Sequence, residues 1–360
     1  MQRVVWRPPL RVVWLVVAAL AAALAVAGCG SGSSTGGANA SASGCKPPRM
    51  VLIINSNLGD GGFYDQANGG VTRTARQFGL CEKTIETGSD PTRWAPAVQD
   101  VSSGNADIVI AGSYEMAQLV EQAAQQHPEK KFVLFDVAYD PKACGGCKNI
   151  YSVTLRSKEN GYLAGVLAGL LTRSRLARTN PQNVVGFIGG QNIPVILDYH
   201  DGFVAGVKQV NPTARIISVY AGSFTDPVKG KQLASGMIGQ GADIVFTASG
   251  STDKGVIEAA AEDNAWALGD SALQTKQSAV NGKQAVITAV DGDIGTPLTS
   301  AVRAIAENRL PVGSVGSFGV KEGAIKIIDS PNYEQFVPES VRKEAQAVQA
   351  KIANGQLVVP

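Results

Sequence analysis

The residues with the most obvious chemical potential gather in one short stretch, "LGDGGFYDQANGG", from Leu58 to Gly70. It contains five glycines, two carboxylates and the adjacent aromatic residues Phe63 and Tyr64. A dinucleotide-binding loop needs the pattern GxGxxG directly after a strand, and these glycines do not have that spacing. An aromatic side chain in such a loop suits stacking on a planar ring. The stretch therefore predicts a loop that offers Phe63 to a flat ligand, followed by a helix over "VTRTARQFG" (Val71–Gly79).

The sequence lacks the side-chain patterns that catalysis requires. It has no GxSxG nucleophile elbow, no HExxH motif, no GxxxxGK[ST] loop and no EF-hand loop. The two histidines, His127 and His200, stand in separate segments, and "QQHPEKK" reads as an exposed helix end. The chain is therefore predicted to bind and release a ligand, with no catalytic residue, cofactor or metal site.

The first residues resemble an export signal. A basic start, "MQRVVWRPPLR", precedes an apolar run over Val12–Ala27 and the ending "VAGC". Small residues before a cysteine form a bacterial lipobox, which predicts removal of residues 1–28 and acylation of Cys29. The alternative is a transmembrane anchor, but the run is shorter than the roughly 20 residues that a span needs. We expect a lipid-anchored protein on the extracytoplasmic face of the cell membrane.

The expected cleavage also changes the charge. The chain has 32 basic and 30 acidic residues, and the signal contains three arginines and no acid, so the mature chain has 29 against 30. Such a balance argues against nucleic-acid binding. Residues 29–44 are rich in Gly, Ser and Ala, which predicts a flexible tether.

Four cysteines follow the lipobox, and an even number in an exported protein predicts disulfides. The motif "CGGC" (Cys144 and Cys147) lies between "YDPKA" and "KNIYSV" in a predicted loop, whereas redox-active cysteines usually begin a helix. A second close cysteine pair, as in zinc sites, is missing. We therefore predict a structural Cys144–Cys147 bridge. Cys45 and Cys81 each come just before a predicted strand and are expected to pair.

The order of elements predicts an α/β protein. Short apolar runs, "MVLIIN", "DIVIAG", "KFVLFDV" and "NIYSVT", are typical of strands buried on both faces of a parallel sheet. Amphipathic segments separate them, and the alternation begins again after Thr154. This pattern predicts two doubly wound parallel-sheet lobes.

The last third of the chain is predicted to return to the first lobe. "GTPLTSAVRAIAENRL" reads as a helix of that lobe, "GSFGVKEGAIKIID" as a strand pair and "PESVRKEAQAVQAKIANGQ" as a terminal helix. The expected lobes are residues 45–154 plus 292–318 and residues 155–291 plus 319–360, with a ligand cleft between them.

Polar residues follow most predicted strands. Ligands of open α/β sheets bind beyond the carboxyl ends of the strands. Turn formation favours the same residue types, so an ordinary turn explains any one of these loops. Six such ends facing one cleft predict a binding site: Asn55–Asp60, Gly112–Ser113, Asp136, Gly189–Asn192, Ser249–Gly250 and Gly269–Asp270.

From Met50 onward the chain resembles the basic membrane protein (PnrA-like) family, the substrate-binding lipoproteins of ABC importers. The resemblance rests on seven segments in order: "LGDGGFYD", "DIVIAGSYEMAQLVEQAAQQHPEKKFVLFD", "ENGYLAGVLAGLL", "VVGFIGGQNIPVILDYHDGFVAGVK", "GSFTDPVKGKQLA", "VFTASGSTDKGVIEAA" and "AKIANGQLVVP". It implies a type I periplasmic-binding-protein fold, a nucleoside ligand with purine nucleosides favoured, a permease and an ATPase as partners, and a monomer.

The resemblance also implies roles for single residues. Phe63 falls on a stacking Phe and Tyr199 near a second aromatic of the opposite lobe. Asp136 falls on an acid that accepts hydrogen bonds from sugar hydroxyls, and Gly250 in a loop that approaches the ligand closely. The expected ligand-binding set is completed by Asp60, which can also cap the following turn, and by Tyr64, Asp65 and Asp270.

Three departures from the family pattern leave the ligand open. Tyr64 stands where the family has Asn, and Asp270 aligns with the family acid only across a one-residue deletion. Ala289, Asp291 and Gly292 occupy the neighbourhood of a family Lys that donates to the base. A pyrimidine nucleoside, a free base or a flavin therefore stays possible. A receptor for a membrane signalling partner is the alternative function, whereas the export signal excludes a DNA-binding repressor.

Overall fold

The computed structural model describes residues 44–277, 279–280 and 282–360. The predicted signal, most of the tether and the predicted lipidation site Cys29 lie outside the described residues. Within these residues, no helix combines the length and the apolar character that crossing a membrane requires.

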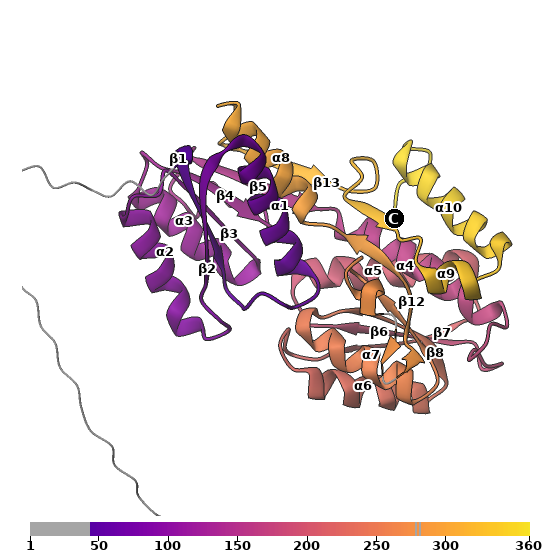
Figure 1. Ribbon diagram of the computed structural model, residues 1–360. Coiled ribbons are helices and arrows are strands. Elements are labelled where there is room, and N and C mark those ends of the chain that lie inside the picture. Colours follow the sequence, from indigo (N-terminus) through magenta and orange to yellow (C-terminus); the bar gives the residue numbers. More distant parts are fainter. Residues whose placement is uncertain (1–43, 278, 281) are drawn as a thin grey trace, which may run out of the picture. The chain divides into compact units, whose positions relative to one another are not determined.

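The first sheet is entirely parallel and has the strand order β13-β5-β4-β3-β1-β2. Alternate side chains of β1 enter two separate cores: Leu52 and Ile54 pack under α1 and α8, and Ile53 packs under α2 and α3. This sheet and its helices are called the first lobe (Figure 1). Its elements are β1 (Lys46–Ile54), α1 (Phe63–Phe78), β2 (Leu80–Glu86), η1 (Pro91–Arg93), α2 (Trp94–Ser103), β3 (Ile108–Gly112), η2 (Tyr114–Met116), α3 (Ala117–Gln126), β4 (Lys131–Phe135), β5 (Ile150–Leu155), α8 (Gly295–Ala306) and β13 (Ser314–Phe318).

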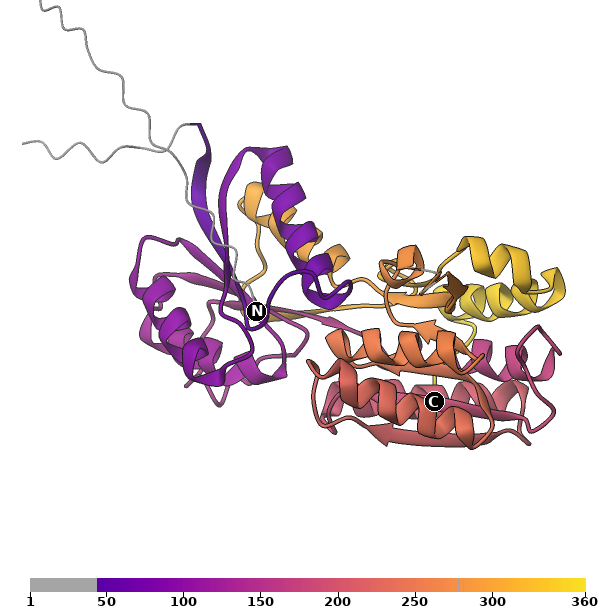
Figure 2. The same cartoon turned by 60° about the horizontal axis from the view of Figure 1, so that its bottom comes forward.

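The second sheet has the order β14-β12-β9-β8-β6-β7, and only β14 runs antiparallel to its neighbour. Helices α4, α5, α9 and α10 cover one face, and α6 and α7 cover the other. This sheet, its helices and a separate two-stranded sheet of β10 and β11 are called the second lobe (Figure 2). Its elements are α4 (Ser157–Arg173), β6 (Val184–Gly189), α5 (Pro194–Val210), β7 (Arg215–Tyr220), α6 (Pro227–Gly239), β8 (Ala242–Ala248), η3 (Gly250–Thr252), α7 (Asp253–Glu262), β9 (Trp266–Gly269), η4 (Gln274–Gln277), β10 (Ala279–Val280), β11 (Lys283–Gln284), β12 (Val286–Gly292), β14 (Ile325–Ile327), α9 (Pro331–Phe336) and α10 (Glu339–Ala353). Two doubly wound sheets confirm the predicted fold class.

The chain passes between the sheets three times, between β5 and α4, between β12 and α8, and between β13 and β14. Helix α8 packs against α1 in the first lobe, as Figure 1 shows. Arg156, at the first crossing, forms ion pairs with Glu159 and with Glu322, which lies in the third crossing. The crossings are therefore tied to each other as well as to the sheets.

The expected loop after β1 is shorter than predicted, because α1 begins at Phe63 and not at Val71. Gly69 and Gly70, read as part of the loop, lie inside the helix. A Cβ atom on Gly70 would stand 2.4 Å from the carbonyl oxygen of Gly295 at the start of α8. This glycine permits close helix packing and does not form a turn.

The two strands predicted over residues 316–329 are both present, but they do not pair with each other. β13 pairs with β5 in the first sheet, and β14 pairs with β12 in the second. Glu322 between them binds the backbone N–H of Gly319 at 2.9 Å, so the intervening segment turns toward the other sheet. The sequence reading also missed α9.

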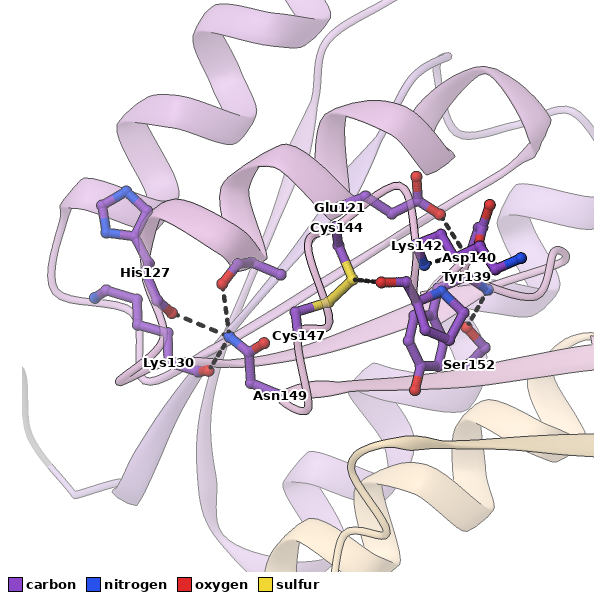
Figure 3. The surroundings of a disulfide bond; sticks show 12 residues. Glu121, His127, Lys130, Tyr139, Asp140, Lys142, Cys144, Cys147, Asn149 and Ser152 are labelled. Atoms are coloured by element: carbon purple, nitrogen blue, oxygen red, sulfur yellow. Dashed lines mark hydrogen bonds between the residues drawn. A yellow bond between two sulfur atoms is a disulfide. The ribbon is translucent and has the colours of Figure 1, made fainter.

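Both expected disulfides are present, and each fixes a segment of the first lobe. Cys45–Cys81 joins the residue before β1 to β2, so Cys81 lies inside a strand and not before one. Cys144–Cys147 closes a tight turn between β4 and β5, with Cys144 buried (Figure 3). The side-chain amide of Asn149 donates to the carbonyl oxygen of Ala124 in the last turn of α3 and to those of His127 and Lys130 after it, which holds the end of this turn in place.

Candidate ligand cleft

A cavity of about 320 Å³ opens between residues of the two lobes. This volume is at the lower end of the range of small-molecule sites, roughly 300–1,000 Å³. It lies beyond the carboxyl ends of strands in both sheets, where the sequence placed it. Seven of the eight predicted ligand-binding residues line it: Asp60, Phe63, Tyr64, Asp136, Tyr199, Gly250 and Asp270.

Asp65, the eighth, does not line the cavity. Its carboxylate accepts hydrogen bonds from the backbone N–H groups of Gly59 (2.7 Å) and Gly61 (2.9 Å). Asp60 accepts from the N–H groups of Gly62, Tyr64 and Asp65 at 2.9 to 3.2 Å. The two carboxylates thus hold the loop and the first turn of α1 together. Because these bonds hold the first turn, the helix begins at Phe63. The carboxylate oxygens of Asp60 are occupied by backbone N–H groups.

Phe63 stands at the edge of the first-lobe core. Its ring centroid is 5.0 Å from that of Tyr64, edge to face, and 5.8 Å from that of Phe135. These rings support Phe63 from the protein side, while the side chain stays partly exposed in the cavity. Phe63 is therefore fixed in position and available to a ligand.

The aromatic that projects into the cavity from the second lobe is Phe224, which the sequence reading did not select. It lies between β7 and α6, and a Cβ on Gly190 would stand 2.2 Å from its ring. Tyr199 lines the cavity but is only 8% exposed, and its ring packs 6.4 Å from that of Phe246. The signal that could have identified Phe224 is its place in "GSFTDP", directly after a predicted strand.

A chain of hydrogen bonds fixes the first-lobe wall. The Tyr64 hydroxyl donates to Asn55 Oδ1 (2.8 Å), Asn55 Nδ2 donates to Ser113 Oγ (3.1 Å), and Ser113 Oγ donates to Glu115 (2.8 Å). Ser113 has φ 94°, an unusual value for a residue other than glycine. Strained backbone of this kind concentrates at functional sites, because the surrounding structure must hold it there.

Asp136 presents an unpaired carboxyl group to the cavity. Its backbone, with φ 78°, donates to Val153 O at 2.8 Å, but the side chain has no hydrogen bond to any described residue. Burial, and then the charge of Glu115, raises the pKa of Asp136 to about 7. A ligand that donates a hydrogen bond here would pair a group that the protein leaves unpaired.

Asp270, at the end of β9, lies beside a second acid, Asp253. Gln274 Nε2 donates to both carboxyl groups, at 2.8 Å to Asp253 and 2.9 Å to Asp270. Burial, and then the charge of Asp253, raises the pKa of Asp270 well above its usual value. Asp291, in contrast, is not among the cavity residues and accepts from Gln66 (2.6 Å) and from the Ala272 N–H (2.8 Å).

Two contacts connect the lobes beside the cavity. Gln66 of α1 reaches Asp291 and Ser271 of the second lobe, and Lys254 donates to the carbonyl oxygen of Gly59 at 2.8 Å. The loop before Phe63 and the first turns of α1 are therefore hydrogen-bonded to the second lobe.

The charge of the lining is one-sided. None of its described residues is Lys, Arg or His, whereas five are acids: Asp60, Glu115, Asp136, Asp253 and Asp270. Within the described chain, no group of three or more His, Cys, Asp or Glu side chains could hold a metal ion. The cavity thus offers aromatic faces and hydrogen-bonding carboxyl groups.

Residues 48–357 match the sequence profile of the family described as "ABC transporter substrate-binding protein PnrA-like". The chain is 25% identical over 316 residues to Basic membrane protein A of Borreliella afzelii, covering 87% of this chain and 91% of that one. It is 27% identical over 267 residues to the ABC transporter nucleoside-binding protein BmpA of Lactococcus lactis subsp. cremoris, covering 70% and 71%.

Solved structures share the fold at lower identity. An ABC transporter solute-binding protein of Aeropyrum pernix K1 superimposes with a TM-score of 0.73 at 22% identity, over 87% of this chain and 94% of that one. A periplasmic solute-binding protein of Actinobacillus succinogenes 130z with bound D-allose gives 0.62 at 14% identity, over 80% and 100%. The fold is that of the type I periplasmic binding proteins.

Proposed function

Because this chain belongs to the PnrA-like family of ABC transporter substrate-binding proteins, we propose that it captures a nucleoside, with purine nucleosides favoured, for an importer. The observation that carries this proposal is the cavity itself, which holds Phe63 and Phe224 from opposite lobes with unpaired carboxyl oxygens beside them. Aromatic faces stack on bases, and carboxyl oxygens accept hydrogen bonds from sugar hydroxyls and ring N–H groups.

The two lobes, residues 45–154 plus 292–318 and residues 155–291 plus 319–360, close on the ligand in this proposal. A closed monomer would then present surfaces of both lobes to the permease, which works with an ATPase subunit. Support comes from the three crossings, which join the lobes, and from the Lys254–Gly59 contact across the cleft.

A thermal-shift screen of residues 44–360 tests the ligand class, because a ligand that binds only the folded protein raises its melting temperature. The panel holds purine and pyrimidine nucleosides, free bases, riboflavin and D-allose. We expect a purine nucleoside to give the largest rise. If only the sugar stabilises the protein, or if no compound does, the flat-ring proposal is wrong.

The membrane anchor is a separate part of the proposal and rests on the lipobox that ends at Cys29. Cys29→Ser should move the protein from the membrane fraction to the soluble fraction or block its processing, since serine cannot carry the thioether-linked lipid. Ser34→Ala, in the predicted tether outside the lipobox, is the control and should leave membrane association unchanged. Unchanged membrane association of a normally processed Cys29→Ser protein would contradict the anchor.

A further inference from the structure

We propose that Asp270 contacts the edge of the bound base and that its protonation state decides its role there. As a neutral acid it donates a hydrogen bond to the base, and as a carboxylate it accepts one. The preference between oxo and amino bases then depends on pH. This inference rests on the proposed nucleoside function and adds a residue that sets specificity.

The first step is the fixed orientation of Gln274. Its side-chain oxygen accepts the backbone N–H of Asp270 at 3.0 Å, which decides which end of the amide carries the NH₂ group. The NH₂ hydrogens go to Asp253 Oδ2 and to Asp270 Oδ1. Gln274 therefore has no N–H left for a ligand and cannot rotate to present one without losing three hydrogen bonds.

The second step is the difference between the two carboxyl groups. Asp253 accepts from the Ser249 N–H (2.9 Å), Ser249 Oγ (2.5 Å), Thr247 Oγ1 and Gln274, which satisfies it as a carboxylate. Asp270 accepts only from Gln274, and its Oδ2 has no partner among the described residues. When two neighbouring acids must share one proton, the group with fewer donors holds it.

The third step is the surroundings of Asp270. The titratable groups that face it are Asp253 of α7, Asp291 of β12, Asp60 before α1 and the Tyr199 hydroxyl of α5. None of them is a cation, and the described cavity lining contains no Lys, Arg or His. The pKa of Asp270 is raised accordingly, first by burial and then by Asp253.

The consequence depends on the atom that the base presents to Oδ2. A protonated Oδ2 donates to a carbonyl oxygen such as O6 of inosine, whereas an ionised Oδ2 accepts from an amino group such as N6 of adenosine. The proton comes from solvent and returns to it, and no other bond changes. The hydroxyls and the Gln191 amide of the lining can turn either way, and the Asn55 amide is held by Tyr64 and Ser113, so none of these neutral groups changes its preference with pH.

The test is calorimetric titration of residues 44–360 with adenosine and with inosine at pH 5.5 and pH 8.0, where both nucleosides are predominantly uncharged. We expect the ratio of the dissociation constants, inosine over adenosine, to rise about tenfold or more between the two pH values, since an unpaired buried acceptor is costly. Repeating the titrations in two buffers of different ionisation enthalpy, at a pH where the ratio changes, should show that inosine binding takes up more protons than adenosine binding.

Two variants decide the assignment. Asp270→Asn should abolish the change of the ratio with pH, whereas Asp100→Asn, on α2 and outside the cavity, should leave it unchanged. A ratio that is independent of pH, or a change that survives Asp270→Asn, overturns this inference alone. If neither nucleoside binds at either pH, the proposed function fails together with it.

Discussion

Phe63 is the residue on which the ligand proposal depends most. Removing its ring takes away one stacking face, which typically costs about 1–3 kcal/mol of binding free energy per base. We therefore expect Phe63→Ala to weaken nucleoside binding by this amount in calorimetry. Phe78, at the other end of α1, is the matched control, since it does not line the cavity. An unchanged dissociation constant for Phe63→Ala would reduce Phe63 to a packing residue.

Asp136 should make the stability of the ligand-free protein depend on pH. Its pKa is about 7 in the folded protein against 3.8 for the ordinary side chain, so the folded state holds the proton more tightly. The free energy of unfolding should therefore fall as pH rises from about 4 to about 7, and stay level above that range.

Urea denaturation at pH 5 and pH 8 measures this effect. The loss of stability should be about 1–3 kcal/mol larger in the wild type than in Asp136→Asn, because the cavity is partly solvated and weakens the full shift. Asn tolerates the positive φ of this position, so the variant keeps the backbone. Equal losses in both proteins would show that Asp136 is not the titrating group.

The sequence predicted which residues line the cavity where their position follows from the end of a strand. Phe63, Asp136, Gly250 and Asp270 all follow predicted strands, and all line the cavity. It could not show that both Asp60 and Asp65 bind backbone N–H groups, or that Asp60 lines the cavity and Asp65 does not, because the two acids stand in the same short stretch of the chain. Gln274 was missed because its role depends on Asp253, a residue that only the fold brings near.

At the scale of elements, α4 and α5 pack with their backbones in direct contact. A Cβ on Gly165 would stand 2.1 Å from the carbonyl oxygen of Phe203, and one on Gly206 2.1 Å from that of Tyr162. These glycines let two helix backbones touch, which fixes α5 and with it Tyr199 at the cavity.

Gly165→Ala should lower the free energy of unfolding by about 1–3 kcal/mol, because the added methyl group forces the helices apart. Gly236→Ala is the matched control. Gly236 lies inside α6, and a Cβ added there would meet no neighbouring atom within 4 Å. Alanine at this position should therefore stabilise the protein by about 0.5–1 kcal/mol. Chemical denaturation of both variants gives the comparison, and a neutral Gly165→Ala would contradict the packing account.

Element types followed from apolar periodicity, but two kinds of boundary did not. The start of α1 depends on two side chains that cap the backbone, and a run of glycines conceals it in the sequence. The separation of β13 from β14 depends on Glu322 and Arg156, whose pairing is long-range in the chain. Neither signal is visible in local periodicity.

For the whole molecule, the alternation of strands and helices predicted two doubly wound lobes, and the sheet orders bear this out. The cleft follows from the crossings, because polar strand ends of both sheets then line one cavity. Ligand chemistry could not be predicted in the same way. It depends on the charge of the lining, which appears only when acids from five separate segments are brought together and no Lys, Arg or His is found among the described lining residues.

The most direct test of the central claim is a crystal structure of residues 44–360 grown with saturating adenosine. The account predicts the base between Phe63 and Phe224, with a sugar hydroxyl within hydrogen-bond distance of Asp136. An empty cavity, or adenosine bound only outside it, would contradict the claim that this cleft is a nucleoside site.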